Sequence, residues 1–194
     1  MSFFPALLKL QNRRILVIGG GKIAGDKISH LLDFTHNITI IAPKIGARVL
    51  QMAQENGLQI IQRAYQKGDV KGFFIVIVAV DDLEVQKEVF HECHQEGALC
   101  NAVDSIEYCD FIFPSYIKEG DLVIAFSTSG ASPALSKYLR RAIQKLLPKD
   151  IGSFLEEIKA LRQKLPKGKE RMKLLDSKAK EYIQNYFTKD ENVQ

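Results

Sequence analysis

The sequence is poor in cysteine, and its three cysteines form no pattern that pairs them or binds metal. Cys93, Cys100 and Cys109 stand seven and nine residues apart, unlike a disulfide framework or a set of zinc ligands. We therefore expect free thiols and no metal site. The sequence also lacks an apolar run long enough to span a membrane, and its first residues lack the basic and apolar regions of a secretory leader. We expect a cytoplasmic protein without a membrane partner.

Apolar side chains are abundant enough for a substantial core. The chain has 194 residues, 46% of them hydrophobic, which fits one large domain or one domain with a smaller appendage. Residues 137–180 hold 14 of the 27 lysines and arginines but only five acidic residues. This basic segment favours an anionic partner, either nucleic acid or a polycarboxylate small molecule. No interleaving of aromatic and basic residues supports nucleic acid, so we expect none.

The most informative motif is a glycine turn between an apolar tetrapeptide and a helical pattern. Residues 15–18 are Ile-Leu-Val-Ile, and Gly19, Gly21 and Ala24 follow with the spacing of the dinucleotide fingerprint G-x-G-x-x-G/A. Gly19 permits a tight turn, Gly21 lets a pyrophosphate approach the backbone, and Ala24 lets the helix pack closely on the sheet. The start of that helix then offers unpaired N–H groups to the phosphates. The alternative is a glycine-rich turn that binds nothing.

Strand and helix patterns alternate through the first 110 residues. Strands are predicted at residues 15–18, 37–42, 58–61, 73–80 and 98–103, with helices after the first, second and fourth of them. The continuous apolar run at 73–80 is typical of a central parallel strand that is covered on both faces. Right-handed crossovers then predict an α/β, Rossmann-type parallel sheet in the order 3-2-1-4-5.

The pattern changes after Asp110. Residues 111–117 and 121–127 flank a short polar turn and predict an antiparallel hairpin. Ser132 followed by Pro133 predicts the start of a helix that runs to residue 147. Ser153 begins a capping-box pattern, which predicts a further helix, and a last helix is expected over residues 172–187. We predict three parts: 1–110, 111–147 and 148–194.

In an open parallel sheet, ligands bind outside the carboxyl ends of the strands, where the strand order reverses. For the predicted order this crevice lies between the first and fourth strands. The candidate cofactor-binding residues at its mouth are Gly19, Gly21, Lys22, Ile23, Pro43, Lys44, Val80, Asp81 and Asn101. The second strand ends without the carboxylate that usually holds the ribose of NAD, whereas Lys44 suits the 2′-phosphate of NADP. The residues leave the choice between NAD and NADP open.

Asp104 is the candidate catalytic residue. It follows the fifth strand, on the side of the crevice where the nicotinamide ring is expected. A carboxylate there can accept a proton or orient a substrate nitrogen. The alternative is an ordinary turn aspartate.

Three motifs, in this order and spacing, resemble the dehydrogenase modules of siroheme synthases. These modules are the precorrin-2 dehydrogenases, some of which are also sirohydrochlorin ferrochelatases. The motifs are Gly19-Gly-Gly-Lys-Ile-Ala24, Asn101-Ala-Val-Asp104 followed by Phe111-Ile-Phe-Pro-Ser115, and Ser127-Thr-Ser-Gly-Ala-Ser-Pro-Ala-Leu135 with Leu139-Arg-Arg141. The resemblance covers essentially the whole chain and is strongest over residues 10–147.

The resemblance implies that the protein oxidises precorrin-2, a tetrapyrrole, to sirohydrochlorin with NAD. In bifunctional members Fe²⁺ is then inserted as a second substrate to give siroheme. It also implies a Rossmann domain, a dimerisation region and a helical C-terminal domain, and hence a homodimer. The family's active-site aspartate falls on Asp104, where it assists proton loss. The turn that lines the tetrapyrrole cleft makes the following residues candidates for substrate binding: Ser127, Thr128, Ser129, Gly130 and Ser132.

This chain departs from the family pattern at one helix. After Ala24 the family continues x-Arg-Lys, whereas this chain has Gly25-Asp26-Lys27 and so lacks the arginine. No methyltransferase module follows, so a stand-alone enzyme is expected. Asp104 alone does not separate dehydrogenases from bifunctional proteins. The second hypothesis is a dinucleotide-sensing regulatory module without catalytic activity, which needs the glycine turn but not Asp104.

Overall fold

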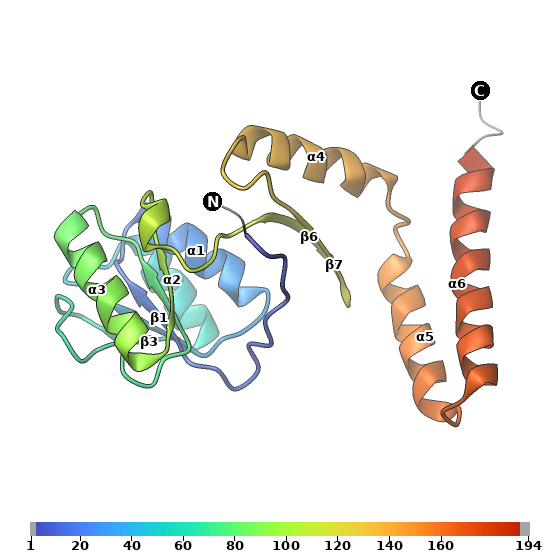
Figure 1. The fold of residues 1–194 in the computed structure, drawn as a ribbon, viewed down its shortest axis with the longest axis horizontal. Helices are drawn as coiled ribbons and strands as arrows, with labels where there is room; N and C mark the ends of the chain where they lie inside the picture. The colour runs from blue at the N-terminus through green and yellow to red at the C-terminus, as the bar shows by residue number, and fades with distance from the viewer. Residues whose placement is uncertain (1–2, 191–194) are drawn as a thin grey trace. The chain divides into compact units, whose positions relative to one another are not determined.

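Five short strands form a parallel sheet in the computed structural model, which describes residues 3–190 (Figure 1). The strands are β1 (Ile15–Ile18), β2 (Ile38–Ile41), β3 (Gln59–Ile61), β4 (Ile75–Val78) and β5 (Leu99–Ala102). Their order is β3-β2-β1-β4-β5, which confirms the predicted topology. Every residue of β1, β2 and β4 is buried, as expected for parallel strands covered on both faces.

Helices α1 (Lys22–Leu32), α2 (Ala47–Asn56) and α3 (Leu83–Glu96) cover this sheet. Side chains alternate between the two faces of a strand. Leu16, Val76 and Val78 therefore share one face, where they pack with Val89 and Cys93 of α3. α1 and α2 pack against each other, and Figure 1 shows them across the sheet from α3.

A buried carboxylate on α3 holds the loop between β3 and β4. Glu92 is 5% exposed and accepts hydrogen bonds from the N–H groups of Gly68 and Val70, each at 3.0 Å. It also accepts a hydrogen bond from the hydroxyl of Tyr65. Burial, helped by this bond, raises the pKa of the Tyr65 hydroxyl, which therefore donates as a neutral phenol. This loop leads into the amino end of β4.

Residues 3–112 form one compact unit and residues 113–190 belong to another. In the second unit, β6 (Ser115–Glu119) and β7 (Leu122–Phe126) pair antiparallel, which confirms the predicted hairpin. Glu119 pairs with Leu122, so the loop has two residues, and Gly120 supplies the positive φ (60°) that such loops need. The further division of this unit at residue 147 stays a prediction.

Three helices complete the second unit: α4 (Pro133–Leu146), α5 (Ile151–Lys164) and α6 (Lys169–Asp190). Ser132 caps α4 as predicted, because its hydroxyl accepts the N–H of Leu135 at 3.2 Å. α5 and α6 pack through stacked rings of Phe154 and Tyr182, whose centroids lie 3.8 Å apart. No helix of residues 3–190 is both long and apolar enough to cross a membrane.

Two predicted helix starts were wrong. Ser153 does not begin α5, which starts two residues earlier at Ile151 with Asp150 as N-cap. Ile151 is buried and belongs to the first turn of the helix, so the capping-box pattern that begins at Ser153 lies inside the helix. The last helix starts at Lys169, not at residue 172, because the N–H of Met172 already donates to the Gly168 carbonyl at 3.2 Å and closes the first turn there.

Candidate cofactor and active site

The turn between β1 and α1 needs glycine at its first position. Gly19 has φ of +125°, and a Cβ added there would lie 2.2 Å from the carbonyl oxygen of Ala79. Its N–H donates to Ile41 at 2.9 Å, and the N–H of Ala79 donates to Ile18 at 2.7 Å. The turn is therefore tied to the ends of β2 and β4, and only glycine fits.

The second glycine holds the neighbouring loop, a role that sequence reasoning missed. A Cβ on Gly20 would lie 2.3 Å from the carbonyl oxygen of Lys44. Gly46 donates its N–H to the Gly20 carbonyl at 2.9 Å. The loop after β2, which carries Pro43 and Lys44, is thereby closed onto the glycine turn. The run of three glycines was the signal for this contact.

The third glycine faces open space. A Cβ on Gly21 would meet no atom within 4 Å, although Gly21 has an ordinary φ of −85°. It is the N-cap of α1, no side chain caps that end, and the first turn carries no acidic residue. Lys22 and Ile23 are exposed beside it. The first-turn N–H groups and the helix dipole are thus suited to a phosphate, and the open space suits a dinucleotide.

Asp104 stands in an unusual backbone conformation after β5. Its φ is +62°, in the left-handed region that non-glycine residues seldom adopt. The Asp104 residue is exposed, so the carboxylate is accessible. Strain of this kind, held by surrounding structure, is typical of functional sites.

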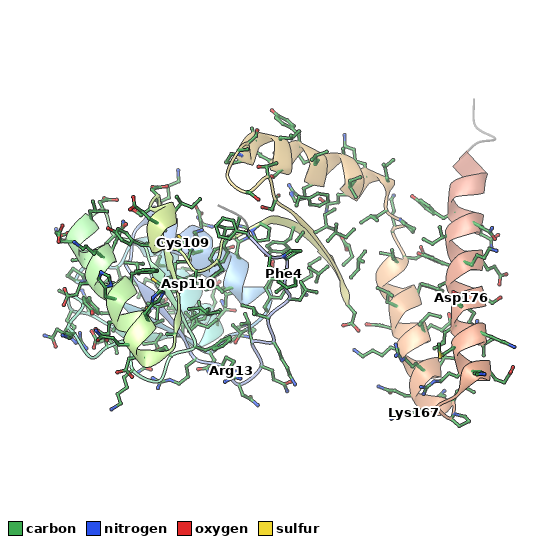
Figure 2. All side chains as sticks on the ribbon, in the orientation of Figure 1. Phe4, Arg13, Cys109, Asp110, Lys167 and Asp176 are labelled. Atoms are coloured by element: carbon green, nitrogen blue, oxygen red, sulfur yellow. The ribbon has the colours of Figure 1, made fainter. Side chains whose placement is uncertain are left out.

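A thiol and an amide hold the segment that carries Asp104. The Cys109 Sγ atom lies 3.0 Å from the carbonyl oxygen of Ala102 and 3.4 Å from that of Ser105. Burial raises the pKa of the Cys109 thiol, which keeps it protonated and able to donate. Asn101 donates from Nδ2 to the Phe111 carbonyl at 2.8 Å. Figure 2 labels Cys109 next to Asp110 at the end of this segment.

Asn101, a candidate cofactor contact, is buried inside the protein. The residue is only 4% exposed, and its Oδ1 atom has no hydrogen-bond partner among the described residues. The amide nitrogen is used within the protein. The contact of Asn101 with a cofactor therefore stays a prediction.

Lys27 of α1 is close enough to Asp104 for the two charges to interact, and sequence reasoning did not select it as a site residue. Burial lowers the pKa of Lys27, while the nearby acidic groups of Cys109 and Asp104 act in the opposite direction. The ammonium group and the carboxylate thus come from α1 and from the end of β5. The sequence signal that could have selected Lys27 is the lysine of the family pattern, three residues after Ala24.

Val80 and Asp81 follow the end of β4. Asp81 is exposed, and Asp82 rather than Asp81 caps α3, accepting the N–H groups of Glu84 at 3.0 Å and Val85 at 3.2 Å. The Asp81 side chain is therefore not engaged as the helix cap. All the predicted cofactor-binding residues and Asp104 belong to the unit of residues 3–112.

The predicted substrate-binding turn belongs to the other unit. Thr128 Oγ1 accepts the N–H of Ser132 at 2.9 Å, and Ser127 Oγ accepts the N–H of Ser129 at 3.1 Å. Ser129 and Gly130 have φ of 51° and 89°. The hydroxyl oxygens thus stabilise a tight turn before α4. Within residues 3–190, no three His, Cys, Asp or Glu side chains gather as a metal site.

Residues 6–115 match the model of a family described as "Putative NAD(P)-binding". The siroheme synthase of Pseudoalteromonas translucida is 34% identical over 165 residues, which cover 85% of this chain and 35% of that protein. Siroheme synthase 1 of Aeromonas hydrophila is 33% identical over 172 residues, covering 85% of this chain and 37% of that protein.

The chain belongs to the siroheme synthase family. It spans about a third of the length of the curated siroheme synthases that it matches. A solved structure of "SirC, precorrin-2 dehydrogenase" is similar over 96% of this chain and 100% of that one, with a TM-score of 0.75 and 26% sequence identity. The Rossmann-type fold and the following hairpin and helices are therefore those of a siroheme synthase relative.

The departure from the siroheme synthase pattern has a structural consequence. Asp26, where the pattern has arginine, forms an ion pair with Arg48 of α2. The two side chains are 48% and 54% exposed, so the pair contributes little stability. The replacement therefore links α1 to α2 on the protein surface.

Proposed function

We propose that this chain oxidises precorrin-2 to sirohydrochlorin with NAD as the hydride acceptor. The observation that carries the proposal is the exposed Asp104 carboxylate, held at a φ of +62° after β5, with Lys27 of α1 close enough for the two charges to interact. A turn suited to a dinucleotide lies at the start of the helix that carries Lys27. Membership of the siroheme synthase family and the likeness to SirC support the same reaction.

The glycine turn and the start of α1 would hold the cofactor. The N–H groups of the first turn would bind the pyrophosphate, and the open space at Gly21 would leave room for it. The loop at Pro43 and Lys44 lies against the turn and would hold the adenine ribose. We assign NAD rather than NADP on the resemblance. When bound, the nicotinamide ring supplies the acceptor for a hydride.

Asp104, with Lys27 nearby, would take up the proton that the oxidation releases. Oxidation removes a hydride and a proton from the macrocycle, and the Asp104 carboxylate accepts the proton as a general base. Lys27 places a positive charge near this carboxylate, and the negative charge of Asp104 in turn counteracts the burial that lowers the pKa of Lys27. Because Asp104 is exposed, the accepted proton can pass to solvent.

The basic helices and the hydroxyl turn would serve the substrate. Precorrin-2 is a polycarboxylate, and the excess of positive charge over residues 137–180 attracts it. The turn at 127–132 would line its cleft, with Ser127, Thr128, Ser129, Gly130 and Ser132 as contacts. In the same way we assign Fe²⁺ insertion to this site, with Asp104 accepting the pyrrole protons and Fe²⁺ as substrate.

We further propose a homodimer. Leu135, Tyr138 and Leu139 of α4 are 50%, 64% and 43% exposed, which leaves an apolar face for a second copy. We expect a dimer in sedimentation equilibrium at micromolar concentration. A monomer under those conditions would contradict the proposal.

The test is an anaerobic assay with precorrin-2 and NAD. We expect one NADH for each sirohydrochlorin formed, and no product without NAD. Adding Fe²⁺ to sirohydrochlorin should then give siroheme faster with the protein than without it. Tight NAD binding without turnover of precorrin-2 would instead favour the regulatory module.

A further inference from the structure

One buried amide of α3 joins the ends of two strands. Gln86 is 5% exposed, and its Nε2 atom donates to the Val80 carbonyl at 2.7 Å and to the Val103 carbonyl at 3.2 Å. β4 ends at Val78 and β5 ends at Ala102, so both carbonyls lie beyond the regular strands. The last bond between these two chain segments is from the N–H of Val103 to Val78, at 2.9 Å. Gln86 therefore continues the connection where the strand pairing stops.

The two carbonyls directly precede Asp81 and Asp104. The carbonyl of Val103 lies in the same planar peptide group as the Asp104 nitrogen. Fixing that carbonyl fixes the plane from which the Asp104 side chain departs at its φ of +62°. On the other side, the Cys109 thiol lies near the carbonyls of Ala102 and Ser105. The Asp104 backbone is thus held from both sides.

Only the nitrogen of the buried Gln86 amide has hydrogen-bond partners among the described residues. Its Oε1 atom is buried and has no hydrogen-bond partner among the described residues. A buried acceptor without a partner is costly, and an apolar side chain of the same length would avoid that cost. The one gain that the amide offers is the connection between Val80 and Val103.

We propose that Gln86 is a positioning residue that sets the direction of the Asp104 carboxylate for proton transfer. This inference rests on the proposed dehydrogenase function. It assigns to Gln86 no contact with substrate or cofactor, and it acts through the peptide group between Val103 and Asp104. The glycine turn has its own bonds, from Gly19 to the Ile41 carbonyl and from Gly46 to the Gly20 carbonyl, so binding of the pyrophosphate there should not depend on Gln86. Among the candidate cofactor-binding residues Gln86 holds only the backbone of Val80.

The same helix provides a matched control. Glu92 is also 5% exposed, and it also holds a loop, through Gly68, Val70 and Tyr65. That loop precedes β4 and carries none of the site residues. Glu92→Gln keeps one oxygen that can accept from Gly68 and Val70 but loses the acceptor of the Tyr65 hydroxyl, so it weakens a buried connection without touching the segment of Asp104.

The experiment compares Gln86→Met with Glu92→Gln in the full chain. For Gln86→Met we expect kcat to fall about 10- to 100-fold, with the KM for NAD within about threefold of wild type. For Glu92→Gln we expect kcat within about threefold of wild type, even if the variant melts at a lower temperature. Equal kcat losses in the two variants, or an unchanged kcat in Gln86→Met, would overturn the proposal.

Hydrogen exchange provides a readout that needs no turnover. We expect faster amide exchange over residues 103–108 in Gln86→Met, and over residues 66–71 in Glu92→Gln. If Gln86→Met does not fold, Cys109→Ala removes the other hold on the same segment and should lower kcat at constant KM for NAD. Wild-type protein that never oxidises precorrin-2 would refute the dehydrogenase function, whereas unchanged exchange at 103–108 in Gln86→Met would refute the positioning role itself.

Discussion

Replacing Asp104 by asparagine is expected to lower kcat for precorrin-2 oxidation by about 10²- to 10⁴-fold, the usual contribution of a general base. Asparagine has nearly the same shape and tolerates the left-handed conformation that Asp104 adopts at φ of +62°. The fold and the binding of NAD should therefore be unchanged. Initial rates of NADH formation, together with the melting temperature, measure both effects.

A neighbouring acid provides the control for this prediction. Glu107 is exposed on the short 3₁₀ helix η1 (Ile106–Tyr108), three residues beyond Asp104. Glu107→Gln removes one negative charge from the same segment but should leave kcat unchanged. Turnover of Asp104→Asn at the wild-type rate would remove Asp104 from the mechanism. An equal loss of kcat in Glu107→Gln would show that the negative charge of the whole segment matters, rather than one general base.

The second large effect is expected at the glycine turn. Gly21→Ala should weaken NAD binding by at least about tenfold, because the new Cβ occupies the space through which the pyrophosphate approaches. Within the protein that Cβ meets no atom within 4 Å, so the loss of stability should stay near 1 kcal/mol, the cost of alanine at an N-cap. Titration of NAD by calorimetry and unfolding in urea separate the two quantities.

Gly19→Ala should behave differently. Its Cβ would lie 2.2 Å from the Ala79 carbonyl oxygen, and its φ of +125° is strained for alanine. The strain alone costs about 1–3 kcal/mol, and the overlap adds to it. We therefore expect Gly19→Ala to destabilise the protein clearly, in contrast to Gly21→Ala. Equal NAD affinity in Gly21→Ala and wild type would mean that no dinucleotide passes over this turn.

The sheet could be predicted from the sequence because its signals are local and repeated. Four-residue apolar runs such as 15–18 and 75–78 can satisfy their burial only inside a sheet covered on both faces. Right-handed crossovers then leave one simple strand order. The glycine turn could be predicted equally well, because Gly19 and Gly21 stand between a strand and a helix.

The contacts that hold the Asp104 segment in place could not be predicted in this way. The hydrogen bonds of Gln86 to Val80 and Val103 join residues 6 and 17 positions away from it, each just after the end of a different strand. Nothing in the local pattern distinguishes Gln86 from a surface glutamine of an amphipathic helix. The positive φ of Asp104 has no compositional signal either, because a turn aspartate is common. Lys27 comes within electrostatic range of Asp104 only because α1 folds back along the sheet, which a local pattern does not show.

The most direct test is a crystal structure with NAD and sirohydrochlorin bound. We expect the pyrophosphate against Gly21 at the start of α1, the nicotinamide ring facing the macrocycle, and the Asp104 carboxylate within hydrogen-bonding distance of a macrocycle nitrogen or carbon-bound proton. An Asp104 carboxylate turned away from both ligands, or a dinucleotide bound elsewhere than at the glycine turn, would contradict the account.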